Sequence, residues 1–235
     1  MTGPGATGVT TEAALAALNG LADPGRAAEM RAYHKVERPY LGLAVPAIDA
    51  LAQDWRAACT LEQRIALAAG LWSSGIHEAM IAAAKLLVQA RIRPDDGAVW
   101  ELIAGWAEEF EGWAVADHAA AAGARRLVAD PARLDRVEGW TQHPNMWTRR
   151  AALVMTLPWA RLNNSKPVDL AVRRRVLGWA AGYADDRDWF IQKAIGWWLR
   201  DLSKHDPQAT RDWVAEHGQR LKPFARKEAL RHLPG

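Results

Sequence analysis

Residues 187–204, RDWFIQKAIGWWLRDLSK, are the most informative part of the chain. At about 100° per residue, as in an α-helix, their side chains separate into two opposed stripes. One stripe is an ordinary buried face and consists of Ile191, Ile195, Trp198 and Leu202. The other stripe alternates aromatic and cationic side chains in the order Trp189, Lys193, Trp197, Arg200, Lys204. The pattern predicts a long amphipathic helix with an unusual exposed side.

Helix signals recur throughout the rest of the sequence. Thr60 and Gln63 have the spacing of a capping box. Asp or Asn precedes further helices, at Asp23, Asp130, Asn145 and Asp206. Seven prolines suit a first helical turn, at positions 24, 46, 94, 131, 167, 207 and 223. We expect helices at residues 11–19, 24–36, 46–57, 61–73, 76–91, 95–109, 113–128, 131–140, 146–158, 167–182, 187–204, 207–217 and 223–233.

Composition and helix length favour an all-α fold. Half of the residues are hydrophobic, and residues that favour β-strands are sparse outside short runs. The expected helices are short, similar in length and joined by tight turns, which is typical of helical hairpins stacked into an α-solenoid. Because no sharp sequence repeat is visible, degenerate HEAT-like repeats are favoured, with a compact irregular bundle as the alternative. We expect a disordered tail at 1–9 and a single domain at 10–235.

Charge is distributed unevenly along the chain. Residues 1–124 carry 9 Lys or Arg against 15 Asp or Glu, a balance of −6, whereas residues 125–235 carry 21 against 12, a balance of +9. A basic half suits a polyanionic partner, of which nucleic acid is the commonest. A solvated, Arg-rich surface explains the same charge equally well.

The exposed stripe of residues 187–204 supports the nucleic-acid interpretation. Exposed tryptophans surrounded by Lys and Arg do little for solubility, but they suit a phosphate backbone with a sugar or base against the indole. Alternatively, the stripe makes a second core contact, with its cations extending outward to solvent.

Two further helices place a charged residue on an apolar arc. In the expected helix 113–128, Asp117 lies one turn after Trp113, so both side chains share a face. A carboxylate there is costly unless it is paired, solvated by a cleft or used in chemistry. In the helix 146–158, Arg150 lies among Trp147, Leu153, Val154 and Leu157 and needs an anion. That anion is either a carboxylate of the protein or a DNA phosphate, and the spacing does not distinguish them.

Several segments together resemble the AlkD-like DNA alkylation repair family. The most specific is Phe190 to Trp197, FIQKAIGW, which continues to Leu199 and Arg200. Weaker matches occur in the family's order: Met30 to Tyr33 with Tyr40 to Leu43, Trp113 with Asp117, Trp147 to Ala152, and Arg226 to His232. One departure is Gly112-Trp113-Ala114, where the family often has Trp-Trp-Asp. The resemblance covers nearly the whole chain after the tail.

The resemblance implies a right-handed HEAT-like solenoid whose concave face holds duplex DNA. It implies a monofunctional DNA glycosylase that hydrolyses the N-glycosidic bond of cationic N3- and N7-alkylated purines in base excision repair. The expected catalytic residues are Asp117, Trp113 and Trp197. The expected DNA-binding residues are Arg150, Tyr33, Lys193, Arg200, Lys204, Trp189, Arg226 and Lys227. We expect Trp113, Asp117, Arg150 and Trp197 to converge on one surface.

Other kinds of chemistry lack a motif. The seven histidines are scattered, His77-Glu78 lacks the second histidine of a zincin motif, and no Walker loop occurs, so we expect no metal and no cofactor. With Cys59 as the only cysteine, no basic and apolar leader, and no long apolar run, we expect a monomer in the bacterial cytoplasm or nucleoid and no membrane partner. Two rival functions stay open: a protein-interaction scaffold, and a non-catalytic DNA-binding paralogue.

Overall fold

The computed structural model describes residues 8–233, and every regular element in this range is helical. An all-α fold is therefore confirmed. The chain divides into two compact units, with the boundary between Ala129 and Asp130. The predicted single domain at 10–235 stays a prediction. Of the predicted tail, residues 1–7 lie outside the described range, and Gly8 and Val9 lead without regular structure into the first helix.

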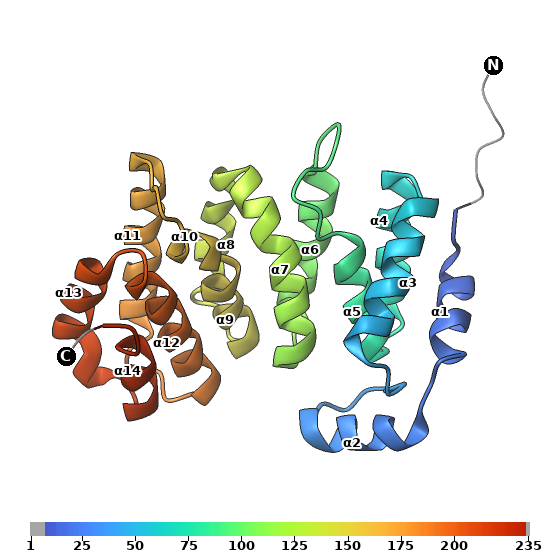
Figure 1. Ribbon diagram of the computed structural model, residues 1–235, viewed down its shortest axis with the longest axis horizontal. Coiled ribbons are helices and arrows are strands. Elements are labelled where there is room, and N and C mark those ends of the chain that lie inside the picture. Colours follow the sequence, from blue (N-terminus) through green and yellow to red (C-terminus); the bar gives the residue numbers. More distant parts are fainter. Residues whose placement is uncertain (1–7, 234–235) are drawn as a thin grey trace. The chain divides into compact units, whose positions relative to one another are not determined.

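The first unit is built around a short, almost entirely buried helix. Its helices are α1 (Thr11–Asn19), α2 (Pro24–His34), α3 (Val45–Ala58), α4 (Leu61–Ser73), α5 (His77–Leu86), α6 (Gly97–Glu108) and α7 (Trp113–Ala129). Helix α5 packs against α3, α4 and α7 (Figure 1). Its alanines, Ala79 and Ala82 to Ala84, are at most 1% exposed, so neighbouring helices approach it closely. Helix α2, in contrast, has no buried residue.

The second unit is organised around the helix that carries the two stripes. Its elements are η1 (Pro131–Arg133), α8 (Leu134–Trp140), α9 (Met146–Met155), α10 (Leu157–Ala160), α11 (Pro167–Gly182), α12 (Trp189–Ser203), α13 (Pro207–His217), η2 (Gly218–Arg220) and α14 (Pro223–Ala229). Helix α12 packs against α9, α10, α13 and α14 (Figure 1). The predicted buried stripe is confirmed, since Ile191, Ile195, Trp198 and Leu202 are each 0% exposed.

Most of the predicted caps are confirmed. The side chains of Asp23, Asp130, Asn145 and Asp206 each accept a hydrogen bond from the first turn of the following element. Thr60 and Gln63 form the reciprocal capping box at the start of α4. Pro94 is the exception: it lies in the loop before α6, eight residues after α5 ends at Leu86.

Several predicted helices are shorter or divided. The helix predicted at 146–158 is two helices, α9 and α10, because the Thr156 hydroxyl donates to the carbonyls of Ala152 and Leu153 and Pro158 follows. The helix predicted at 24–36 ends at His34, since Lys35 adopts a left-handed conformation with φ of 55°. Those predicted at 76–91 and 223–233 end at Leu86 and Ala229.

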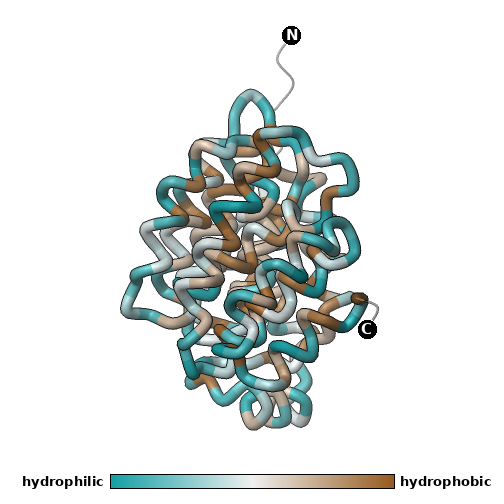
Figure 2. The backbone as a smooth tube through the Cα atoms, turned by 90° about the vertical axis from the view of Figure 1, so that its left-hand side faces the viewer, coloured by the Kyte–Doolittle hydropathy of each residue, from teal (hydrophilic) through white to brown (hydrophobic). Residues whose placement is uncertain are grey.

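Hydrophobic and hydrophilic residues separate along the chain as a helical protein requires. Figure 2 shows hydrophilic residues concentrated in the turns, with hydrophobic stretches running along the helices. Between residues 8 and 233, no helix has both the length and the apolar character needed to cross a membrane.

Candidate functional site

The first unit gathers aromatic rings from separate helices around Trp113, the first residue of α7. Tyr33, near the end of α2, meets Trp113 edge to face, with ring centroids 6.0 Å apart at 85°. His34 lies 5.2 Å from the same indole. Tyr33 is 70% exposed, so one side of the cluster is open to solvent. The structure thus brings together the predicted site residues Tyr33 and Trp113, although 80 positions separate them in the sequence.

Two histidines extend this cluster into the interior. His77, the first residue of α5, lies 4.7 Å from both His34 and Tyr40, measured between ring centroids. Burial and, to a lesser extent, coulombic interactions with His34, Arg38 and His118 lower the pKa of His77 to about 3. Burial also lowers the pKa of His34. Both rings are therefore neutral at physiological pH, and the cluster behaves as packed aromatic surface.

Asp117 occupies the position predicted for it, one turn after Trp113 on α7, and its side chain is half-buried. Its neighbours on the predicted apolar arc are of two kinds: Ala120 and Ala124 are buried, whereas Ala121 and Val128 are exposed. The carboxylates of Asp49 and Asp117 act to raise the pKa of His118, but burial dominates and the pKa is lowered. A carboxylate thus lies beside an indole on one helical face.

A buried carboxylate fixes the loop that leads from α2 to α3. Glu78, 0% exposed, accepts hydrogen bonds from the backbone amides of Leu41, Gly42 and Leu43 at 2.9, 2.8 and 3.3 Å. Gly42 has a φ of +81°, and a Cβ atom there would lie 2.3 Å from the Asp23 carbonyl oxygen. The Asp23 amide in turn donates to the Leu41 carbonyl. This connection holds the start of α2, and hence Tyr33, against the unit.

Gly112, at a position where the resemblance implies a tryptophan, is tightly packed. A Cβ atom at Gly112 would lie 2.7 Å from Cγ2 of Val36, so even alanine would require Val36 to move. A small pocket occupies this region and is lined by His34, Val36, Arg38, Tyr40, His77 and residues 112–115. This chain therefore has a shallow aromatic pocket where the resemblance implies a second tryptophan.

In the second unit, two indoles on the predicted exposed stripe of α12 both contact the same lysine ammonium group. Trp189 is 46% exposed, and Trp197 is half-buried. The Lys193 Nζ lies 4.7 Å from the ring centroid of Trp189 and 4.9 Å from that of Trp197. These distances are those of cation–π contacts, which hold the two rings and the ammonium together.

Arg150, on α9, contacts one of these two indoles, that of Trp197. Its guanidinium carbon lies 5.6 Å from the ring centroid of Trp197 and 5.8 Å from that of Trp147, and its side chain is 2% exposed. The structure therefore unites the predicted residues Arg150, Trp197, Lys193 and Trp189 in one patch. The two indoles compensate part of the cost of burying a charge among apolar residues.

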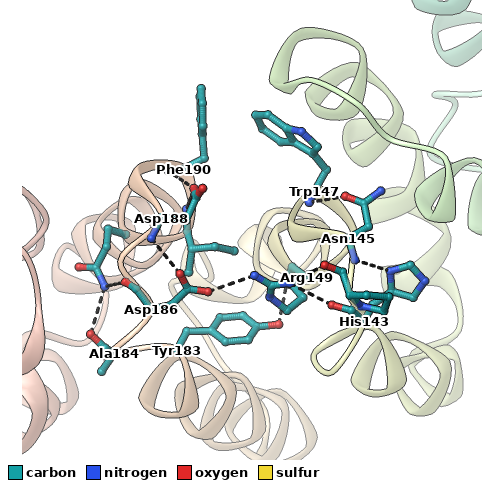
Figure 3. A network of polar contacts seen from close by, with 12 residues as sticks. His143, Asn145, Trp147, Arg149, Tyr183, Ala184, Asp186, Asp188 and Phe190 are labelled. Carbon is teal, nitrogen blue, oxygen red and sulfur yellow. Dashed lines mark hydrogen bonds and ion pairs between the residues drawn. The ribbon is translucent and has the colours of Figure 1, made fainter. Parts of the chain in front are cut away.

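A polar network fixes the starts of α9 and α12, which carry this patch (Figure 3). Arg149 donates to the carbonyls of His143 and Pro144 and to the Asp186 carboxylate. Tyr183 donates to the Arg149 carbonyl, and Asp188 caps α12 by accepting from the Phe190 amide. Trp147 and Phe190 pack above the network with ring centroids 4.6 Å apart. The loops before the two helices are thus bound to each other.

Gln192 connects the same network to α14. Its side chain, 0% exposed, donates to the carbonyls of Ala184 and Asp186 and accepts from the amide of Lys222, the residue before α14. All three partners are backbone groups, which suits a role in fixing chain geometry. Gln192 lies within the predicted motif, but its role is visible only once the loops are placed.

The remaining predicted cations differ in their surroundings. Arg200 is bound within the protein, donating to Glu228 at 2.5 Å and to Asp201 at 3.1 Å. It therefore has a structural role that the sequence did not indicate. Lys204 is exposed and caps α12, and Arg226 and Lys227 are exposed on α14. The latter three present their charge to solvent.

The structure thus assembles two groups of predicted residues, one in each unit. The predicted convergence of Trp113 and Asp117 with Arg150 and Trp197 stays a prediction. Residues that the sequence analysis missed are His34, Tyr40, His77 and Phe224. For His34, Tyr40 and His77, the sequence offers only aromatic or imidazole side chains at 33–34, 40 and 77. Their spacing follows no helical period, so it does not predict that they meet. Within residues 8–233, no group of three or more His, Cys, Asp or Glu side chains is placed to hold a metal ion.

Comparisons with known proteins agree with this geometry. A family model described as DNA alkylation repair enzyme matches residues 14–233. No curated protein matches the chain. Among solved structures, one described as a predicted DNA alkylation repair enzyme from Enterococcus faecalis superposes with a TM-score of 0.71 at 22% identity, covering 90% of this chain and 96% of its own.

Two structures from Streptococcus mutans are also similar. That of smu.31 from strain UA159 gives a TM-score of 0.59 at 18% identity, covering 81% of this chain and 93% of its own. That of AlkD2 gives 0.59 at 17% identity, covering 90% and 99%. These likenesses establish the fold, and the family model establishes kinship. Because that model spans nearly all of the described residues, the protein belongs to the DNA alkylation repair enzyme family.

Proposed function

We propose that the protein is a monofunctional DNA glycosylase that hydrolyses the N-glycosidic bond of N3- and N7-alkylated purines in duplex DNA. Membership of the alkylation repair family supports a role in repair. The observation that carries the proposal is the arrangement on α7, where the half-buried Asp117 carboxylate follows the Trp113 indole by one turn. An aromatic face beside a carboxylate suits a sugar that becomes positively charged.

The chemistry needs little acid catalysis. An alkylated purine is cationic, so the C1′–N bond breaks with its electron pair moving to the base, which leaves neutral. The deoxyribose then has oxocarbenium character, and Asp117 stabilises that charge. Water adds to C1′ and loses a proton, which Asp117 accepts or passes to solvent. The products are a free base and an abasic site. In this scheme Trp113 and Trp197 pack against the deoxyribose or the cationic base.

The second unit supplies the charges that hold DNA. We propose that Lys193, Lys204, Arg226 and Lys227 bind phosphate, that Arg150 holds a phosphate beside the lesion, and that Trp189 packs against the backbone. Tyr33 adds an aromatic contact from α2. The full proposal is a right-handed HEAT-like solenoid with a concave DNA face, acting as a monomer in the bacterial cytoplasm or nucleoid.

Base release from a defined lesion tests this function. A duplex oligonucleotide with one N7-methylguanine is incubated with the full chain, and abasic sites are counted by strand cleavage in alkali. We expect release well above the spontaneous rate with wild-type protein, and release close to the spontaneous rate with Asp117→Asn. Asp54→Asn, which removes an exposed carboxylate from α3, is the matched control and retains activity. Wild-type release at the spontaneous rate would reject the proposal.

One observation favours a second function, that of a non-catalytic DNA-binding member of the family. The packing of Val36 against Gly112 leaves no room for a second aromatic ring, and Ala114 brings no second carboxylate. In this second proposal, the protein binds duplex DNA through the second unit and leaves the glycosidic bond intact. The base-release experiment separates the two functions when duplex affinity is measured alongside it.

A further inference from the structure

A groove runs between α12 and α14 in the second unit, and the proposed function gives no role to one of its aromatic rings, that of Phe224. Its floor is narrow because the helices approach closely at Gly196, where a Cβ atom would lie 3.2 Å from the Ala225 carbonyl oxygen. One wall carries Trp189, Lys193 and Trp197 from α12, and the other carries Phe224 and Lys227 from α14 and Arg231 from the residues that follow it. Its volume is about 540 Å³, within the range of roughly 300–1,000 Å³ typical of small-ligand sites.

The aromatic side chains that line the groove are partly exposed to solvent. Trp189 is 46% exposed and stacks on Phe224 with ring centroids 5.6 Å apart at 27°. Phe224 and Trp197 are each half-buried. Three rings therefore open into one groove. Large aromatic side chains left accessible in this way mark binding surfaces.

The charge of the groove is positive after its internal ion pairs are counted. The carboxylate on its wall, Glu228, is bound by Arg200 at 2.5 Å and lies 3.6 Å from Arg231. Lys193 contacts indole faces, and Lys227 is exposed. An occupant should therefore combine a flat ring with an anionic group.

We infer that this groove binds a single unpaired nucleotide of a DNA strand, with its base on the aromatic rings and its phosphate at Lys193 and Lys227. Paired DNA presents phosphates and sugars to a protein, but its base faces are covered by neighbouring pairs. A base face becomes available only when a nucleotide leaves the stack. The accessible rings of the groove, added to its cations, favour such a nucleotide over intact duplex. This inference rests on the proposed DNA binding and extends it to DNA with a bulge.

Binding to matched hairpins tests the inference. Two fluorescein-labelled DNA hairpins of the same stem are titrated with the full chain by anisotropy, one fully paired and one with a single unpaired thymidine. We expect the bulged hairpin to bind about tenfold more tightly, the effect of stacking one base on aromatic side chains.

Phe224→Leu retains apolar bulk but removes the ring, and should abolish the preference. Lys227→Ala changes an exposed residue, folds normally, and should weaken binding of the bulged hairpin more than that of the paired one. Arg211→Ala, an exposed cation on α13 outside the groove, should keep the preference.

Three outcomes overturn the inference. Equal affinity of the wild type for both hairpins means that the cations hold duplex phosphate and the rings have no base to bind. A preference that survives in a folded Phe224→Leu protein places the unpaired base elsewhere. Binding to neither hairpin assigns the groove to another partner, such as an acidic peptide. Loss of the preference with intact release of N7-methylguanine refutes this inference alone, whereas bulge preference without base release refutes only the proposed catalysis.

Discussion

The two units of the chain differ in charge and in how they arrange aromatic side chains. The first unit has 11 Lys or Arg against 15 Asp or Glu, and the second has 19 Lys or Arg against 12 Asp or Glu. In the first unit, neutral rings surround Trp113. In the second unit, the indoles alternate with the cations Lys193 and Arg150. The candidate catalytic carboxylate, Asp117, lies in the negative unit and most candidate phosphate ligands lie in the positive one. This separation means that substitutions in the two units should change different measurable quantities, namely the rate of chemistry and the affinity for DNA.

The largest expected effect is on the rate, at Asp117. Asp117→Asn retains the shape of the side chain but removes its charge, so the single-turnover rate of base release should fall by about 10²–10³-fold. Duplex affinity should hold or rise, because a negative charge near phosphate is lost. Rapid-quench kinetics and an affinity titration on the same variant measure both quantities. If the variant instead melts at a much lower temperature with its rate intact, Asp117 is a structural ion-pair partner.

The second effect concerns stability in the positive unit. Gln192→Leu leaves the carbonyls of Ala184 and Asp186 and the amide of Lys222 without their buried side-chain partner. We expect the free energy of unfolding to fall by about 2–3 kcal/mol. Urea denaturation measures it, and Gln208→Leu, on the exposed side of α13, is the control. A loss no greater than that of the control would show that the loops are held by other contacts.

The third effect is a pH dependence that belongs to the negative unit. Between its folded pKa of about 3 and its unfolded value of 6.5, His77 binds more protons in the unfolded state. The free energy of unfolding should therefore rise with pH across this window, by up to about 1.4 kcal/mol per pH unit, and level off above pH 6.5. His77→Gln should flatten the slope between pH 5 and 6.5, measured by urea titrations. His232→Gln, an exposed histidine, should leave it unchanged.

The smallest effect is on salt dependence in the positive unit. Replacing both Lys193 and Lys204 with alanine should reduce the slope of log affinity against log salt by about 1.8, or about 0.9 for each phosphate contact. Arg26 and Arg91, exposed cations of the negative unit, make the matched double variant and should leave the slope unchanged. An equal change from both pairs would mean that duplex binding is shared by the two units.

Helix caps and the buried face of α12 could be predicted from the sequence, whereas the break in the helix predicted at 146–158 could not. The caps at Asp23, Asn145 and Asp206 and the buried stripe of α12 depend on neighbouring residues, so propensity and period identify them. The helix predicted at 146–158 breaks because Thr156 bonds to its own preceding turn, an alternative that sequence does not distinguish from an unbroken helix.

The candidate sites depended on contacts between distant segments. Trp113 and Asp117 were recognised because they lie one turn apart and resemble a family motif, but the rings of His34 and His77 come from other helices and have no period in common. Arg150 required an anion in the sequence interpretation, and the structure adds two indoles that no spacing rule links to it. Arg200 was expected to bind phosphate because it lies on the stripe of α12, and its ion pair with Glu228 was missed because Glu228 lies 28 positions away.

The loop that Glu78 binds makes α2 a segment that can be altered separately from the core. Helix α2 contributes no buried residue, so its sequence is nearly independent of the core, and it is held at its start by the loop that Glu78 binds and at its end by rings. A segment attached in this way can be exchanged for another between fixed anchor points with little loss of global stability. Under the proposed function, Tyr33 on this helix contacts the lesion, so substitutions that alter this contact should cost little global stability.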